Sequence, residues 1–101
     1  MRQMSMSFEQ ATARIAELRK IGPIGEAHAH CGNNRAELMR SEKAGCFYCC
    51  EIFGASFVDD WIDEDTTALC PKCRIDSVIG DAAGFPITDA AFLKAMNKVW
   101  F

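Results

Sequence analysis

The sequence lacks several features, and each absence excludes a class of protein. No apolar run is long enough to cross a bilayer, and no Pro-, Gly- or Ser-rich tract would form a linker between domains. The first ten residues, MRQMSMSFEQ, contain no apolar core of signal-peptide length. We therefore expect one domain, residues 1–101, in the cytoplasm, a compartment where structural disulfides are rare.

An excess of positive charge is also missing. The chain has 11 Lys and Arg residues against 14 Asp and Glu residues, which gives a formal net charge of −3. Non-specific binding to nucleic acid needs lysines and arginines that displace counterions from phosphates. The charge balance therefore argues against that function, although it is compatible with a local basic patch.

Cysteine, in contrast, is abundant. Four of the six cysteines form two C-x2-C pairs separated by twenty residues: Cys46, Cys49, Cys70 and Cys73. This spacing is typical of a four-cysteine zinc site. Two residues between thiols allow a tight turn, a zinc knuckle, to point both sulfurs at one ion, and two knuckles supply the tetrahedral set that Zn²⁺ prefers. The sequence therefore predicts one structural Zn²⁺, whose binding is coupled to folding.

Two other uses of the cysteines are less compatible with the sequence. A disulfide framework would suit a secreted domain, but nothing in the sequence indicates secretion. The segment CFYC, residues 46–49, is similar to the active-site motif of glutaredoxins, which lies after a strand and before a long helix. Here a predicted helix precedes the motif, and CEIFGAS after it does not have the pattern of a long helix. A thiol oxidoreductase is therefore the weaker interpretation.

Two cysteines stand outside the knuckles. Cys31 ends the segment HAHC with His28 and His30, so a second metal site there is an open alternative. We expect instead that His30 forms a hydrogen bond across the domain, to backbone near a zinc knuckle. Cys50 follows a predicted ligand directly and is expected to be a small buried hydrophobe.

Periodicity and capping residues predict an α+β protein. A helix is expected over 7–22, with Ser7 as its cap. A second is expected over 34–44, with Asn34 as its cap and with Leu38 and Met39 turned inward. A third is expected over 88–101, with Thr88 as its cap, and at least one of its two terminal aromatic residues, Trp100 and Phe101, is expected to pack back against the fold. Pro71 suits the first position of a further helix that ends at Gly80 or Gly84. The segment 24–32 is expected to be irregular. Between the knuckles we expect two or three short strands with a turn at 63–66.

The two knuckles, with a hairpin between them and a helix after the second, resemble a treble-clef zinc finger over about residues 45–80. HNH-type nucleases use this scaffold and carry a catalytic histidine on the hairpin. The corresponding stretch here is FVDDWIDED, with Asp60 or Trp61 where that histidine would stand, and no histidine follows His30. The resemblance therefore implies the scaffold without the nuclease activity, since the histidine base is central to that chemistry.

The chain also resembles a group of small, uncharacterised bacterial cytoplasmic proteins. The resemblance is carried by His30, Trp61 and the segments NRAEL (34–38), GCFYC (45–49), TALCPKC (67–73), IDSVIGD (75–81), GFPIT (84–88) and WF (100–101). Two positions depart from the pattern. Arg74 stands where a glycine usually follows the last cysteine, and Cys31 stands where a serine is more usual.

A closed four-thiol site leaves no open position for catalysis, so we predict a binding module and not an enzyme. The first expectation is contact with a protein, through the aromatic C-terminus or through an acidic segment that could mimic nucleic acid and so inhibit a nucleic-acid enzyme. That segment contains Asp59, Asp60, Asp63, Glu64 and Asp65. The alternative is a nucleic-acid-binding finger that uses Arg35, Arg40, Lys43, Lys72 and Arg74. A third is a degenerate nuclease with a site at His28 and His30.

Overall fold

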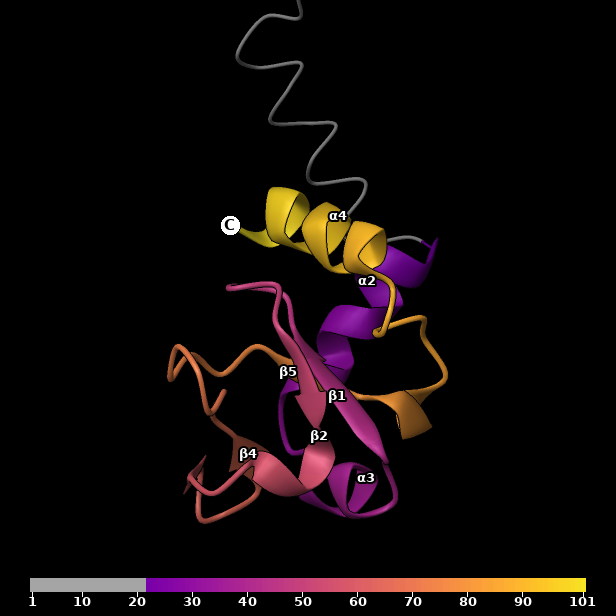
Figure 1. The fold of residues 1–101 in the computed structure, drawn as a ribbon. Coiled ribbons are helices and arrows are strands. Elements are labelled where there is room, and N and C mark those ends of the chain that lie inside the picture. Colours follow the sequence, from indigo (N-terminus) through magenta and orange to yellow (C-terminus); the bar gives the residue numbers. More distant parts are fainter. Residues whose placement is uncertain (1–21) are drawn as a thin grey trace, which may run out of the picture.

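A computed structural model describes residues 22–101 of the chain and shows a small α+β fold (Figure 1). Its helices are α2 (Gly22–His28), α3 (Arg35–Met39) and α4 (Ala90–Trp100), with single 3-10 turns η1 (Ala29–Cys31), η2 (Ala55–Phe57) and η3 (Asp81–Ala83). Its strands are β1 (Lys43–Cys46), β2 (Ile52–Gly54), β3 (Trp61–Ile62), β4 (Thr67–Ala68) and β5 (Val78–Gly80). Among these described elements, no helix has the length and apolarity to cross a bilayer. The helix predicted over 7–22 falls almost entirely outside the described residues.

The strands form two antiparallel sheets. The larger has the order β2-β1-β5, so β1 lies in the centre and β2 lies at an edge, and the smaller is the hairpin β3-β4. Ala44 on β1 is paired with Phe53 on one side and with Gly80 on the other. The hairpin turn at 63–66 is confirmed, and so are the short strands predicted between the knuckles.

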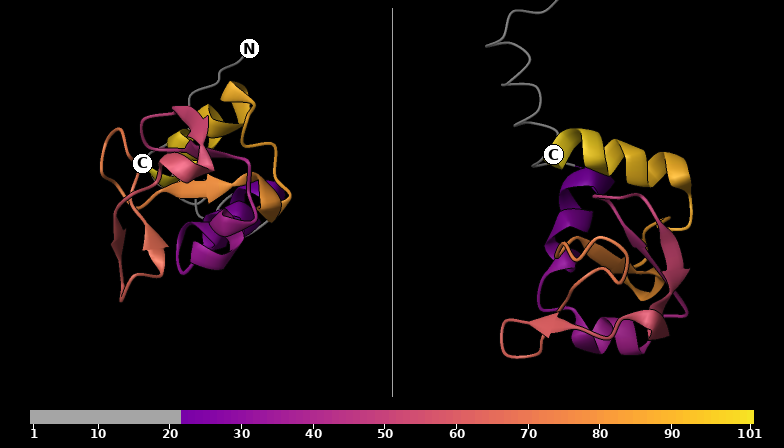
Figure 2. Two further views of the ribbon diagram at one scale, coloured as in Figure 1. Left: turned by 60° about the horizontal axis from the view of Figure 1, so that its bottom comes forward. Right: turned by 60° about the vertical axis from the view of Figure 1, so that its left-hand side comes forward.

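The larger sheet separates two groups of buried side chains. Because side chains alternate along a strand, Ala44, Cys46 and Val78 share one face and pack with α3 and the β3-β4 hairpin. Ile79 is on the opposite face and packs with Leu93 and Met96 of α4. Figures 1 and 2 show α4 across one end of the sheet and α3 at the other. Each fully buried Leu or Met contributes roughly 1.5–3 kcal/mol to folding.

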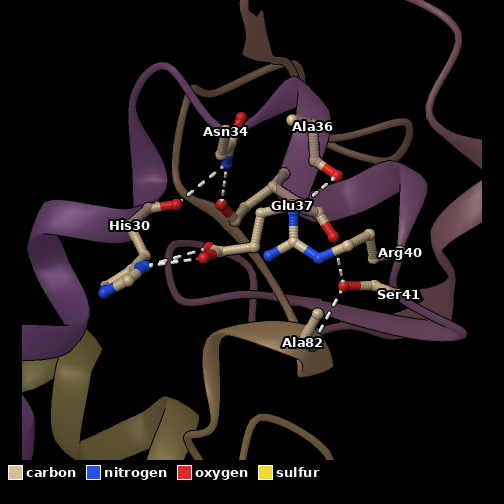
Figure 3. Close-up of polar contacts among 8 residues, drawn as sticks. His30, Asn34, Ala36, Glu37, Arg40, Ser41 and Ala82 are labelled. Atoms are coloured by element: carbon tan, nitrogen blue, oxygen red, sulfur yellow. Dashed lines mark hydrogen bonds and ion pairs between the residues drawn. The ribbon is translucent and has the colours of Figure 1, made fainter.

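One buried amide connects three segments of this layout. The Asn34 side chain donates to the backbone oxygens of His30 (3.0 Å) and Val78 (2.8 Å) and accepts from the N–H of Ala68 (3.1 Å). Figure 3 shows its contact with His30 just before α3 begins. The prediction that the Asn34 side chain caps α3 is therefore wrong, because those three bonds occupy the amide.

The second predicted helix is shorter than expected. It ends at Met39 and not at Gly45, which lies within β1. Leu38 turns inward as predicted, but Met39 is 75% exposed. The reason is tertiary: Ala44 and Cys46 bury their side chains in the sheet, and this pairing outweighs the helix propensity of the preceding residues.

The helix predicted to open at Pro71 is also wrong. Val78–Gly80 is a strand that pairs with β1, and the next helix, α4, begins only at Ala90. Ser77, Val78 and Ile79 are all buried. A short apolar run of this kind does not distinguish a buried strand from a helix by periodicity alone.

Two further local predictions differ from the structure. Segment 24–32 was expected to be irregular, but α2 and η1 make most of it helical, and Gly22 begins α2 where it was predicted to end a helix. The cap of α4 is Asp89, whose carboxylate accepts from the N–H of Ala91, and not Thr88. Asp and Thr are both good caps, so sequence alone does not choose between neighbours.

The buried stripe of α4 is Leu93, Met96 and Val99, with Phe92 only half-buried. Trp100 packs back as expected, because its Nε1–H donates to the backbone oxygen of Ile24 at 3.3 Å and its ring stacks on His28. Phe101 is 61% exposed.

Gly45 provides a test of the contact between β1 and α4. A Cβ atom at this position would lie 2.8 Å from the backbone oxygen of Ile87 and 3.0 Å from Leu93. Gly45→Ala is expected to lower the free energy of unfolding by about 1–3 kcal/mol through overpacking. The measurement is urea denaturation followed by circular dichroism with zinc held constant. Gly32→Ala is the control, since nothing lies within 4 Å of its Cβ position; equal stability of both variants would contradict this packing.

Candidate metal centre

The first knuckle links β1 to β2. Cys46 ends β1, and its N–H donates to the backbone oxygen of Glu51 at 3.0 Å, which closes the turn. Inside the turn, the N–H of Tyr48 points at the Cys46 sulfur at 3.4 Å. Cys50, which directly follows the second cysteine, has a left-handed backbone with φ of 61°.

The second knuckle repeats this conformation between β4 and β5. The N–H of Cys70 donates to the backbone oxygen of Ile75 at 3.0 Å, and the N–H of Lys72 points at the Cys70 sulfur at 3.3 Å. Arg74, directly after the second cysteine, is again left-handed, with φ of 67°. Two segments that share the C-x2-C pattern have therefore adopted the same turn.

The two knuckles bring four sulfurs together. All four Sγ atoms lie within 4.8 Å of one another, and the Cys46–Cys73 and Cys49–Cys70 pairs are each 3.7 Å apart. A tetrahedral ion with metal–sulfur bonds of about 2.3 Å requires sulfur–sulfur edges of about 3.8 Å. All six cysteines are free thiols, since a disulfide requires sulfurs about 2.05 Å apart. The arrangement therefore fits a single tetrahedral metal ion.

Burial makes the thiolate form unfavourable at most of this cluster. Burial is the main cause that raises the pKa of Cys49 well above its ordinary value and the pKa of Cys73 to about 11. At Cys70 burial is again the largest single cause and raises the pKa, but hydrogen bonds to its sulfur together outweigh burial, so its pKa is lowered. These bonds come from the N–H groups of Cys73 and Lys72 and from the thiols of Cys49 and Cys73. Four adjacent thiolates at neutral pH therefore need a cation to offset their mutual repulsion.

Ser77 is a member of the site that sequence reasoning missed. Its hydroxyl lies 3.1 Å from the Cys46 sulfur, and the residue is 1% exposed. A hydroxyl in this position can donate to a thiolate and orient it, as outer-shell groups do around metals. The spacing of the cysteines carries no signal for it, because Ser77 reaches Cys46 only through the pairing of β5 with β1.

The two remaining cysteines lie apart from the four sulfurs. Cys31 and Cys50 are both half-buried and pack against the apolar group around Leu93, so Cys50 is less buried than predicted. Burial and the nearby charge of Asp76 raise the pKa of Cys31 to about 11. Burial and the charge of Cys46 also raise the pKa of Cys50. Both therefore favour the protonated, poorly nucleophilic form at neutral pH.

The two histidines do not join Cys31 in a metal site. Within residues 22–101, the four knuckle cysteines are the one group of three or more ligand side chains close enough to hold an ion. The His28 ring stacks on Trp100 with 3.7 Å between ring centroids. His30 Nδ1 is bonded to the Glu37 carboxylate at 2.9 and 3.1 Å, as Figure 3 shows. The prediction that His30 bonds to backbone near a knuckle is therefore wrong, because its partner is the Glu37 side chain.

The acidic segment and two nearby arginines form a mixed surface. Asp63, Glu64 and Asp65 are exposed and form the left-handed tip of the β3-β4 hairpin. Arg74 lies 3.5 Å from a carboxylate oxygen of Asp59 and 3.7 Å from one of Asp60. Arg35 lies over the Trp61 ring at 4.7 Å and donates to the backbone oxygen of Asp65.

Removal of a single thiol tests the metal assignment. Cys73→Ser is expected to abolish stoichiometric metal binding and unfold most of the protein, because three sulfurs no longer close the site. The measurement is metal content by mass spectrometry together with circular dichroism. Cys31→Ser is the control and should keep about one metal ion per chain. Equal metal content in both variants would contradict the four-sulfur site.

The left-handed conformation of Arg74 gives a second prediction. A residue with a side chain is destabilised by roughly 1–2 kcal/mol in the left-handed conformation, whereas glycine adopts it without this strain. Arg74→Gly is therefore expected to raise the free energy of unfolding by about 0.5–1 kcal/mol, since the exposed ion pairs it removes contribute little. Lys72→Gly, in the same turn but without positive φ, is the control and should lower stability. Chemical denaturation at fixed zinc distinguishes the two.

Comparison of the chain with protein-family models, with curated proteins and with solved structures finds no match. The resemblances to treble-clef fingers and to the group of small bacterial proteins therefore remain predictions, and the interpretation of the metal centre depends on the geometry of its cysteines.

Proposed function

We propose that the chain is a zinc-stabilised binding module that acts through contact with another protein. The observation that carries this proposal is the cluster of four thiol sulfurs, all within 4.8 Å of one another. Four thiolates complete a tetrahedral coordination sphere and leave no position for water or substrate, which is the arrangement of structural and not catalytic zinc. The ion then holds two strand ends together, and function depends on the surface.

The donor set supports zinc over other ions. Thiolates are soft ligands, and a tetrahedral set of four sulfurs suits Zn²⁺ or iron, whereas Mg²⁺ and Ca²⁺ require oxygen. With one closed four-sulfur centre and no further ligand group among the described residues, a structural Zn²⁺ is the most economical assignment.

The type of finger is part of the proposal. The hairpin β3-β4 between the knuckles supports the treble-clef resemblance, but β5 stands where that finger has its helix. Ribbon-type structural sites also use two C-x2-C knuckles. The strands that leave both knuckles favour the ribbon type.

Contact with protein is favoured over contact with nucleic acid because of where the cations lie. Of the five cations predicted for a nucleic-acid surface, Arg74 is paired with Asp59 and Asp60, and Arg35 is held over Trp61. The exposed carboxylates of Asp59 and Asp60 lie beside Arg74 and would repel phosphates. A nuclease at His28 and His30 is also disfavoured, because both rings are engaged within the fold.

The proposal is tested by affinity capture from nuclease-treated lysate of the source cells. Immobilised wild type and Cys31→Ser are expected to retain the same protein in about equimolar amount, and Cys73→Ser is expected to lose it because the metal site is incomplete. Mass spectrometry identifies that protein, and gel filtration of the two purified components must reproduce the complex. Capture of nucleic acid alone, with strong salt dependence, would favour the alternative function and contradict this one.

A further inference from the structure

The outer edge of β2 has unpaired backbone groups. In the β1-β2 register, the N–H of Cys46 donates to the backbone oxygen of Glu51, and the N–H of Ala55 donates to that of Glu42. Hydrogen-bonded and non-hydrogen-bonded residue pairs therefore alternate between these two bonds. The pairs Lys43–Gly54 and Gly45–Ile52 are the non-bonded ones. The N–H and C=O groups of Ile52 and the N–H of Gly54 therefore point away from β1, and within residues 22–101 no bond outside the helices and strands engages them. The C=O of Gly54 differs, because Gly54 is the N-cap of η2 and its oxygen accepts the first bond of that 3-10 turn.

A groove runs along this open edge. It has a volume of about 440 Å³ and lies between β2, η2 and the second knuckle, which contributes Pro71 and Lys72. Apolar side chains line it on the β2 side, where Ile52 is 38% exposed and Phe57 is 67% exposed. An exposed apolar groove beside unpaired strand edges is the geometry used to bind an extended peptide.

The charges of the groove define its occupant. Lys43 and Lys72 both line it, and in the described part of the chain neither forms an ion pair with a carboxylate. The arginines nearest the hairpin, in contrast, already contact acidic or aromatic groups. The groove therefore offers two free cations beside apolar surface, and an occupant with acidic side chains would complement it.

We propose that this groove, the β2 edge groove, binds an extended segment of a partner protein that alternates apolar with acidic residues. The segment adds a strand beside β2, and its backbone bonds to Ile52 and to the N–H of Gly54. Its apolar side chains pack on Phe57, and its carboxylates pair with Lys43 and Lys72. The inference rests on the proposed function as a protein-binding module and names the contact surface.

A second copy of this chain fits the groove less well. Pairing of two β2 edges would bring the lysines of both grooves together, and like charges oppose such contact. The chain's own acidic stretch, Asp63–Asp65, is left-handed in three successive residues and cannot form a strand in that conformation. A partner segment that is both acidic and extended has neither defect.

The probe is a synthetic peptide, acetyl-Asp-Val-Glu-Ile-Asp-Val-Glu-amide, titrated into the zinc-loaded full chain labelled with ¹⁵N. We expect shifts at Ile52, Gly54, Phe57, Lys43 and Lys72, and slower amide exchange at Ile52 and Gly54. A matched peptide with lysine at each acidic position should bind at least about tenfold more weakly.

Gly54 offers a matched pair of variants. Its φ of −66° suits proline, and its N–H points outward, so Gly54→Pro removes one donor from the groove and none from the β1-β2 ladder. Gly54→Ala adds a comparable Cβ atom, which meets the Phe57 ring at 3.3 Å, and keeps the N–H. Gly54→Ala is expected to bind the peptide within about threefold of wild type, and Gly54→Pro at least about tenfold more weakly.

Any of three outcomes would contradict peptide binding in the β2 edge groove. The first is that the acidic peptide does not bind wild type, the second is that it binds both Gly54 variants equally, and the third is that its chemical-shift changes are confined to the β3-β4 hairpin. A dimer seen in sedimentation of wild type that dissociates in Gly54→Pro would assign the edge to self-pairing. If Gly54→Pro captured the lysate partner at the same level as wild type, the groove would be rejected while the binding-module function would stand. If wild type bound neither metal nor a partner protein, that function would be rejected, independently of the peptide result.

Discussion

The convergence of four cysteine sulfurs, all within 4.8 Å of one another, is the constraint on which the rest of this structure depends. Cys46 and Cys70 start two equivalent turns in segments far apart in sequence, and their sulfurs and those of Cys49 and Cys73 meet between two small sheets. Burial alone disfavours the ionised thiols, so the same packing that brings the sulfurs together makes them depend on a metal. In a chain of 101 residues, where the apolar core is modest, a cation bound by these four sulfurs would couple metal binding to folding and add to the free energy of unfolding.

Hydrogen bonds from buried polar side chains organise the loops around the four sulfurs. Asn34 connects η1, β4 and β5 through one buried amide, and Ser77 contacts the Cys46 sulfur from β5. These bonds hold the second knuckle against the first without long helices or strands. Buried amides with all partners satisfied specify one arrangement of the chain, because a wrong arrangement leaves them unsatisfied.

The sequence was most informative where local chemistry decides the structure. Two C-x2-C pairs predicted which four sulfurs meet, because each turn is set by residues within its own segment. The hairpin turn at 63–66 and the helix at the C-terminus were predicted for the same reason. Prediction failed where partners distant in sequence decide. Val78–Gly80 is a strand because β1 is beside it, α3 ends early because Ala44 and Cys46 enter the sheet, and Asn34 bonds to Val78 instead of capping its own helix. The free edge of β2 could not be predicted from the sequence either, since it depends on the order of strands in the sheet.

The contact between α4 and the first knuckle carries a further consequence. The amide of Asn97 donates to the backbone oxygen of Tyr48 at the tip of the knuckle, at 2.9 Å, and the Phe101 ring lies against Tyr48. One turn of helix away from Asn97, the Trp100 indole stacks on His28. The C-terminal helix is thus fastened to the loop that carries two of the sulfurs, and the indole is placed where displacement of that loop alters its surroundings. The fluorescence of Trp100 would therefore respond to a rearrangement of the loop that carries Cys46 and Cys49.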